Sequence, residues 1–158
     1  MTEFRGRQRK IMAPNRYTEL FFLDEVTALA AGHRPCFECR NGRAKSFAAA
    51  FPGEPMPADN IDLVLHRERC VSGAPQPLID GKAIEALPVG AMIATRNTCF
   101  AIAADRLLEW GFSGYRAVGR NEATGIFALE AVKLLTPQST VEALRNGYRP
   151  TFHHSAHA

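Results

Sequence analysis

The chain has 158 residues, of which 46% are hydrophobic, and this is enough apolar material to bury a core. A disordered tail is therefore excluded. The longest apolar runs fall well short of the roughly 20 residues that cross a bilayer, and the opening MTEFRGRQRK has no apolar segment behind its charges. We expect a soluble, cytoplasmic protein without a membrane partner.

The positive charge is concentrated at the front of the chain. The formal net charge is only +3, from 19 Lys and Arg against 16 Asp and Glu. Residues 1–45 hold nine basic side chains and five acidic ones, which leaves ten basic and eleven acidic side chains for the rest. A basic surface is therefore expected at the front, while the total charge alone does not demand a polyanionic partner.

The first part of the chain predicts an arm, a strand and a helix. Residues 1–16 are polar and basic, and the run from Tyr17 to Leu23 is rich in residues that favour a short strand. Asp24 is a good N-cap for a helix over 25–31, and Gly32 is typical of the position just after a helix. Val26, Leu29 and Ala30 then share one face.

Two further helices are expected before residue 71. Phe47 and Phe51 are four apart in the run over 43–51, which indicates a helix with one apolar side. A loop follows, and Asp59 or Asn60 can cap a helix over 61–70. Residues 71–90 are rich in glycine and proline and predict a boundary between two lobes.

The second half of the sequence consists of short runs that are typical of β-strands. The runs AMIAT, CFAIAADRLLEW, GYRAV and GIFALEAVKLL are separated by RN, GFSG and GRNEATG, which predict turns between three or four antiparallel strands. A helix is expected to begin near Ser139. We therefore predict an α+β fold: a small α-rich zinc-binding lobe with a basic arm over 1–72, and an antiparallel β lobe with a C-terminal helix and tail over 73–158. One compact domain is the alternative.

A pair of cysteines two residues apart, in GHRPCFECR, is the strongest chemical signal. Without an export signal the four cysteines are expected to stay reduced, which favours metal binding. Two thiolates on a tight turn can bind one Zn²⁺, and structural zinc needs two more ligands. The alternatives for Cys36 and Cys39 are a redox pair or two core thiols. Redox chemistry is disfavoured because the motif follows a helix.

The second pair of zinc ligands is sought elsewhere in the chain. His66 and Cys70 are i and i+4 on a predicted helix, and they complete the spacing C-x2-C-x26-H-x3-C. A solvated helix face and a buried helix end are the alternative interpretations of these two residues. The other candidates are the pair His153 and His154, and less easily His33 and Cys99.

A phrase of ten residues occurs twice. VTALAAGHRP (26–35) and VEALRNGYRP (141–150) agree at six positions, and the continuations CFEC and TFHH align Cys39 with His154. One interpretation is that both copies use the same helix stop, glycine followed by proline. The other is a pair of related units that meet around one site.

The stretch FFLDEVTALAAGHRPCFECR, within the run from Tyr17 to Arg40, resembles the second half of the zinc-binding domain at the front of bacterial Ada-type methylated-DNA repair proteins. In that family a strand and a helix lead into a G-[FY]-R-P-C-x-x-C turn whose cysteines bind zinc. His33 replaces the aromatic residue here, and the positions that match are Gly32, Arg34, Pro35, Cys36 and Cys39. The resemblance covers about 24 of the 158 residues.

The sequence departs from that family at the other two ligands. In the family they come from a cysteine pair upstream of the turn, and one of them is the methyl-accepting thiolate. No cysteine precedes Cys36 in this sequence, so the resemblance does not extend to methyl transfer from phosphotriesters. The whole chain also resembles a family of bacterial proteins without an established activity. Some of its members carry extra residues in front, where further ligands would lie if Met1 is an internal start.

Zinc binding beside a basic surface predicts association with DNA or another nucleic acid. Zinc would fix the turn so that nearby cations face phosphates, and the affinity would depend strongly on salt. A basic face that only keeps the protein soluble is the alternative. The predicted phosphate contacts are Arg34, Arg40, Arg43 and Lys45, with the arm residues Arg5, Arg7, Arg9 and Lys10.

Two other functions remain open. A zinc- or cysteine-dependent, hydrolase-like enzyme would use Glu38 or Glu68 to carry a proton, or Cys36 or Cys70 as nucleophile with His33 or His66 as base. The deaminase pattern is incomplete because no H-x-E precedes the P-C-x-x-C motif. A protein-interaction module would use the aromatic residues of EWGFSGY, namely Trp110, Phe112 and Tyr115, which otherwise support a hairpin and core.

Overall fold

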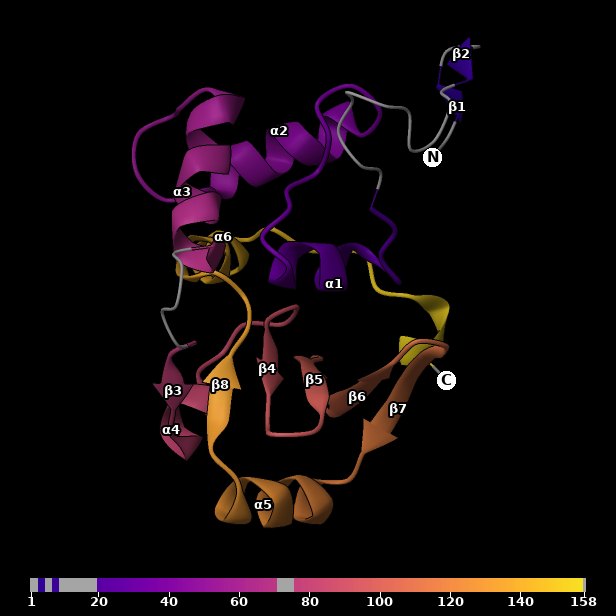
Figure 1. Ribbon diagram of the computed structural model, residues 1–158, viewed down its shortest axis with the longest axis vertical. Coiled ribbons are helices and arrows are strands. Elements are labelled where there is room, and N and C mark those ends of the chain that lie inside the picture. Colours follow the sequence, from indigo (N-terminus) through magenta and orange to yellow (C-terminus); the bar gives the residue numbers. More distant parts are fainter. Residues whose placement is uncertain (1–2, 5–6, 9–19, 71–75, 158) are drawn as a thin grey trace.

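The computed structural model describes residues 3–4, 7–8, 20–70 and 76–157. A group of helices lies against one end of an antiparallel sheet (Figure 1). The helices are α1 (Glu25–Ala30), α2 (Asn41–Ala50), α3 (Ala58–Cys70), α4 (Gly81–Glu85), α5 (Arg120–Leu129) and α6 (Gln138–Arg145), followed by the short 3₁₀ turn η1 (His154–His157). The strands are β1 (Glu3–Phe4), β2 (Arg7–Gln8), β3 (Leu78–Ile79), β4 (Met92–Ala94), β5 (Cys99–Ile102), β6 (Leu107–Gly111), β7 (Gly114–Val118) and β8 (Val132–Leu134).

Helix α1 begins and ends where the sequence predicts. The Asp24 side chain accepts a hydrogen bond from the Thr27 backbone N–H at 2.9 Å, while Thr27 Oγ1 accepts from the Asp24 backbone N–H at 3.2 Å, so the two residues form a capping box. Gly32 follows the helix with φ +81°, a conformation that side chains with a Cβ disfavour. These short-range signals fix the chain direction into the cysteine turn.

The helical part is held by one apolar cluster. Leu29 of α1, Phe47 of α2 and Leu65 of α3 are at most 1% exposed, and Leu144 of α6 packs among them. The ring centroid of Phe47 lies 5.1 Å from that of Tyr148, edge to face. The C-terminal helix α6 therefore completes the core that α1, α2 and α3 begin, although it lies in the second half of the sequence.

The sheet has six strands in the order β3-β8-β4-β5-β6-β7, and every neighbouring pair is antiparallel. Ile93 of the central strand β4 pairs with Phe100 of β5 and with Leu134 of β8, and all three side chains are buried. Helix α5 lies at the end of the sheet farthest from α1, α2 and α3 (Figure 1). The predicted α+β fold, with an antiparallel sheet and a C-terminal helix, is confirmed.

Several predicted elements differ from the structure. The run over 99–110 was expected to be one strand but forms the β5–β6 hairpin, and residues 20–22 carry no strand. Residues expected to form a turn before Gly125 belong instead to α5, which begins at Arg120. Ile126 and Phe127 of that helix pack against the sheet cluster. Burial of this apolar face therefore outweighs the weak helix propensity of glycine.

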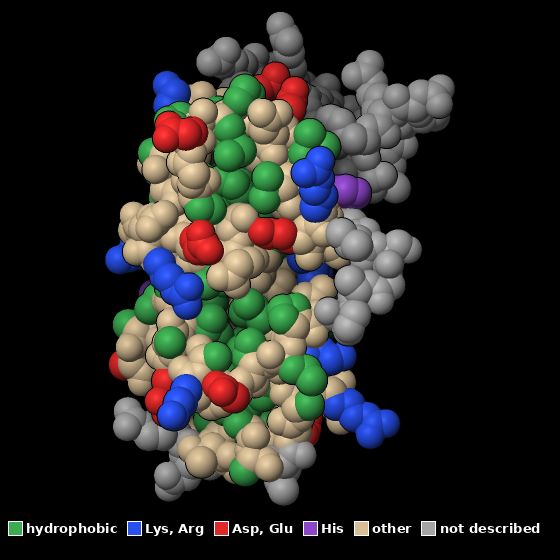
Figure 2. Space-filling view, turned by 90° about the vertical axis from the view of Figure 1, so that its left-hand side faces the viewer, with side chains coloured by type: hydrophobic (Ala, Val, Ile, Leu, Met, Phe, Trp, Pro, Cys, Tyr) green, Lys and Arg blue, Asp and Glu red, His purple; other side chains and the backbone are tan. Residues whose placement is uncertain are grey.

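Figure 2 shows the side of the molecule where α3 and β3 lie, and on it Lys and Arg side chains are interspersed with Asp and Glu. Hydrophobic side chains also reach this surface. Among the exposed hydrophobic residues are Leu63 of α3, at 54% exposure, and Leu78 of β3, at 66%. Within the described part of the chain, every helix is too short or too polar to cross a bilayer.

Candidate functional site: the cysteine turn

The two cysteines of the C-x-x-C motif lie on one hydrogen-bonded turn directly before α2. The backbone N–H of Arg40 donates to the Cys36 carbonyl oxygen at 2.9 Å, and α2 begins at Asn41 directly afterwards. Cys36 is exposed and Cys39 is half-buried. Because side chains three positions apart on a helical turn face the same side, both sulfurs are presented together.

Backbone N–H groups point at the Cys36 sulfur. The Glu38 N–H lies 3.3 Å from Cys36 Sγ. Burial alone would raise the pKa of Cys36, but hydrogen bonds from the backbone of Cys39 and Glu38 and from the Cys39 side chain lower it. Burial and the bond to Cys36 raise the pKa of Cys39. The turn thus favours a sulfur anion at Cys36, the form in which cysteine binds metals.

The turn is anchored to the neighbouring helices by polar contacts. Arg34 forms a forked ion pair with Asp62 of α3, with Nε 2.8 Å from Oδ1 and Nη2 2.8 Å from Oδ2. The Arg34 guanidinium also lies 5.1 Å from the centre of the Phe37 ring. The Asn41 side chain donates to the Phe37 carbonyl oxygen at 2.8 Å. The backbone that carries the two cysteines is therefore tied to α3 and α2.

The predicted second pair of ligands lies on α3. His66 is exposed on this helix, and the Cys70 side chain lies outside what the structure describes. Among the residues that are described, no three His, Cys, Asp or Glu side chains come together to hold one metal ion. His66 is therefore not grouped with Cys36 and Cys39, and the set of four ligands stays a prediction.

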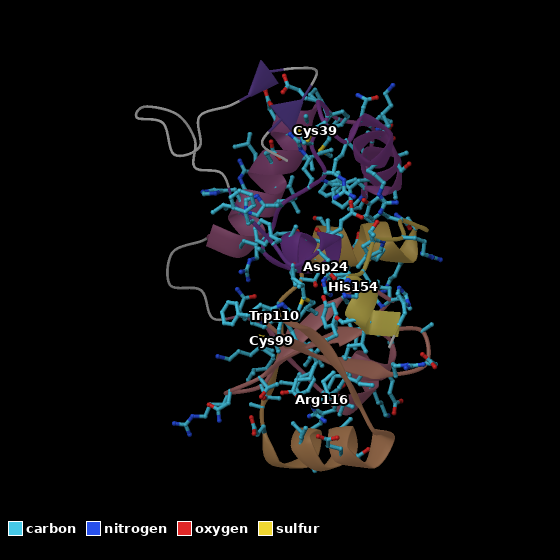
Figure 3. All side chains as sticks on the ribbon, turned by 90° about the vertical axis from the view of Figure 1, so that its right-hand side faces the viewer. Asp24, Cys39, Cys99, Trp110, Arg116 and His154 are labelled. Atoms are coloured by element: carbon cyan, nitrogen blue, oxygen red, sulfur yellow. The ribbon has the colours of Figure 1, made fainter. Side chains whose placement is uncertain are left out.

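The alternative histidine and cysteine ligands lie elsewhere. Figure 3 shows Cys39 in the upper, helical part, His154 near Asp24 below it, and Cys99 beside Trp110 at the sheet. The His153 backbone N–H donates to Asp24 Oδ2 at 2.9 Å, and the His153 ring contacts Ser155 Oγ at 2.9 Å. These two histidines belong to the junction between α1 and the C-terminal tail.

The two copies of the repeated segment end their helices, α1 and α6, in the same way. After α1, the N–H groups of Gly32 and His33 donate to the carbonyls of Leu29 and Ala28, both at 2.9 Å. After α6, the N–H groups of Gly147 and Tyr148 donate to Leu144 and Ala143 at 3.2 and 3.0 Å. Both ends are Schellman motifs. The first interpretation of the repeat is confirmed, and the joint Cys and His site of the second is not formed.

A buried carboxylate at the start of α1 was not predicted as a special residue. The Glu25 side chain is 3% exposed and forms an ion pair with Arg43 of α2. It also accepts from the Tyr148 hydroxyl and the Thr151 backbone N–H, both at 2.8 Å. These partners lower the pKa of Glu25, although burial acts to raise it. The only sequence signal was an acidic residue in the first helical turn, which many helices carry.

The predicted phosphate contacts are of two kinds. Arg34 and Arg43 are engaged by Asp62 and Glu25, and Arg43 also donates to the Arg149 carbonyl oxygen at 2.6 Å. The Arg40 side chain is 43% exposed, with Nη2 3.7 Å from Glu25 Oε1, and Lys45 is exposed on α2. The side chains of the basic arm lie outside the described residues.

The residues proposed for the other functions have structural partners. Glu68 accepts hydrogen bonds from the Ser139 backbone and from its hydroxyl, the latter at 2.6 Å, so it caps α6. The Tyr115 hydroxyl donates to Asp24 Oδ2 at 2.9 Å, and Tyr115 is buried. Phe112 is 94% exposed at the tip of the β6–β7 hairpin, where its ring contacts that of Trp110 with centroids 4.9 Å apart.

Comparison with protein-family models gives no match, and comparisons with curated proteins and with solved structures give none either.

Proposed function

We propose that this chain is a cytoplasmic zinc-binding protein associated with nucleic acid, as its resemblance to the Ada-type metal-binding domain suggests. The observation that carries the proposal is the cysteine turn, in which both thiols are accessible and the Glu38 N–H lies 3.3 Å from Cys36 Sγ. Backbone N–H groups that point at a sulfur stabilise the thiolate, which is the form that ligates zinc.

The chemistry of the turn fits zinc, and the turn would supply two of the four expected ligands. Bound zinc would tie Cys36 and Cys39 to a common centre and stiffen the start of α2. For the remaining positions we retain His66 and Cys70, because Asp62 on the same helix already reaches Arg34 beside the turn. The exposed His66 side chain is not grouped with the two cysteines, so zinc binding through it requires a rearrangement.

Phosphate binding is supported by the charges that remain exposed near the turn. Arg40 and Lys45 carry unburied positive charge on either side of the first turn of α2. A surface hollow there is lined by Cys39 and by the residues from Arg40 to Arg43, and no side chain caps the N-terminus of the helix. Uncapped N–H groups and the helix dipole favour an anion at this position.

Elemental analysis of the full chain, purified without chelator, tests the zinc proposal. We expect about one zinc per chain, loss of zinc in the double variant Cys36→Ser with Cys39→Ser, and full zinc content in the control Cys99→Ser. His66→Ala and Cys70→Ser should weaken zinc binding if these residues are ligands. Zinc that persists in the double cysteine variant would reject the site.

Binding to labelled DNA and RNA across a salt series tests the nucleic-acid proposal. Two phosphate contacts predict a slope of about −1.8 in log affinity against log salt on duplex DNA, and contacts from the arm would steepen it. The variant Arg40→Ala with Lys45→Ala should flatten the slope. Lys82→Ala with Lys133→Ala removes the same charge from exposed positions of the sheet half and should change it little. A flat response in the wild type excludes phosphate contacts.

A further inference from the structure

We propose that Cys36 and Cys39 form a reversible disulfide by exchange with a small anionic disulfide such as oxidised glutathione, and that Cys36 reacts first. The observation behind this proposal is the arrangement of the two sulfurs on the turn that precedes α2. The motif follows α1 and leads directly into α2, so the two sulfurs lie on the connection between these helices.

The backbone of the turn already has a geometry that a disulfide can bridge. The bond from the Arg40 N–H to the Cys36 carbonyl closes one helical turn at 2.9 Å. Side chains three apart on a helical turn have Cβ atoms about 5–6 Å apart, and a disulfide brings the Cβ atoms to roughly 3.5–4.5 Å, so the two Cβ atoms have to approach by about 1–2 Å. The Cys39 side chain also hydrogen-bonds Cys36. Joining the sulfurs therefore requires little movement of the chain.

The two sulfurs differ in access, and this sets the order of reaction. Cys36 is exposed, so a bulky disulfide can approach it from solvent, whereas Cys39 is half-buried just before α2. Arg40 follows directly, with 43% of its side chain exposed. A guanidinium beside the turn attracts the carboxylates of a glutathione-like reagent. Cys39 is then placed to attack the adduct on Cys36 from within the protein.

The exchange balances in two steps. The Cys36 sulfur attacks one sulfur of the reagent, a Cys36–glutathione bond forms, the reagent disulfide breaks, and the first glutathione leaves as a thiol with the proton from Cys36. The Cys39 sulfur then attacks Cys36 Sγ, and the second glutathione leaves with the proton from Cys39. The protein loses two electrons and two protons, and the reagent is reduced to two thiols.

The disulfide also excludes metal, because neither sulfur then remains as a thiolate ligand. This consequence rests on the proposed zinc binding, whereas the exchange reaction does not. The two proposals are therefore tested separately: zinc content is measured on the reduced protein, and disulfide formation is measured on the metal-free protein. Either proposal can be rejected while the other stands.

The test is a time course of the full metal-free chain with oxidised glutathione, quenched by alkylation and mapped by mass spectrometry. The wild type should gain a Cys36–Cys39 disulfide that dithiothreitol removes. Cys39→Ser should accumulate a glutathione adduct on Cys36, and in Cys36→Ser the adduct on Cys39 should form at least about tenfold more slowly, because access controls the rate. Cys99→Ser is the control and should behave as the wild type.

Three results would overturn the proposal. They are a wild type that keeps both thiols free at equilibrium with excess oxidised glutathione, an adduct that forms on Cys39 as fast as on Cys36, and a stable mixed disulfide on Cys36 that Cys39 does not resolve. Mass spectrometry of the wild type alone shows whether both thiols stay free. The proposal can therefore be rejected even if a variant fails to fold.

Discussion

Replacing Glu25 with glutamine tests whether its buried carboxylate holds α1 to the segment that follows α6. Glu25 contacts Arg43 of α2, the Tyr148 hydroxyl and the Thr151 backbone N–H, and its own backbone N–H donates to the Thr151 carbonyl oxygen at 3.2 Å. Glutamine keeps the shape of the side chain but removes the charge. It also places an NH₂ donor where the carboxylate has only acceptors.

The magnitude follows from what the substitution removes. A hydrogen bond to a charged group contributes about 1.5–3 kcal/mol, and glutamine can accept from only one of Tyr148 and Thr151. The ion pair with Arg43 must be discounted, because the Arg43 side chain is 35% exposed and solvent screens it. We expect Glu25→Gln to lower the free energy of unfolding by about 2–3 kcal/mol, and Glu25→Ala to lower it by about 3–4 kcal/mol.

Urea unfolding at pH 7, followed by circular dichroism and by Trp110 fluorescence, measures this loss. The midpoint should fall by about 1 M, with the slope unchanged if unfolding stays two-state. Glu54→Gln is the matched control, because Glu54 is exposed in the loop before α3 and should change the stability by less than about 0.5 kcal/mol. If Glu25→Gln costs no more than the control, the carboxylate does not hold the tail and the reasoning is wrong.

The remaining predictions concern pH and glycine. The pKa of Glu25 lies below its ordinary value of 4.5, so the stability difference between wild type and Glu25→Gln should stay constant near neutral pH and shrink as the pH falls through that lowered pKa. Gly147→Ala, at φ +104° in open space, should cost about 1 kcal/mol. Gly32→Ala should cost more, because its Cβ would lie 2.7 Å from an arginine side chain of α3. Gly114→Ala should lower the free energy of unfolding by about 2–3 kcal/mol, because Gly114 has φ +138° and the added Cβ would lie 2.5 Å from Ser155 Oγ. Thermal unfolding measures all three losses.

The parts of the fold that sequence reasoning located depend on neighbours a few residues apart. Asp24 and Gly32 mark the ends of α1 through hydrogen bonds to Thr27 and Leu29 respectively, and such short-range bonds leave a local sequence signature. Helix α5 has no such signature. Gly119 before it and Gly125 within it indicate turns, and the helix is stabilised instead by Phe127, whose ring lies 5.9 Å from that of Phe100 in the sheet. A contact between distant residues cannot be read from either segment alone.

The candidate site shows the same division. The cysteine turn was located because its spacing carries the chemistry, and its position between α1 and α2 follows from local helix signals. The network of Glu25 was missed because Tyr148 and Thr151 lie more than a hundred positions away in the sequence. The ion pair of Arg34 with Asp62 was also missed, because Asp62 lies 28 positions further along the sequence. Exposure of a basic residue therefore could not be inferred from its place in a basic run.

The two copies of the repeated phrase show how one local structure serves two purposes. Both α1 and α6 end in a Schellman motif, and in both cases Arg and Pro follow it in the sequence. The segment after α6 is held to α1 by hydrogen bonds. The backbone N–H of Thr151 donates to the Glu25 carboxylate, and that of His153 donates to the Asp24 carboxylate. After α1 the chain carries sulfur at the same place, and there the backbone N–H of Glu38 turns inward to Cys36. The segment after α6 is thus held by α1, whereas the segment after α1 leaves the Cys36 side chain exposed and Cys39 half-buried.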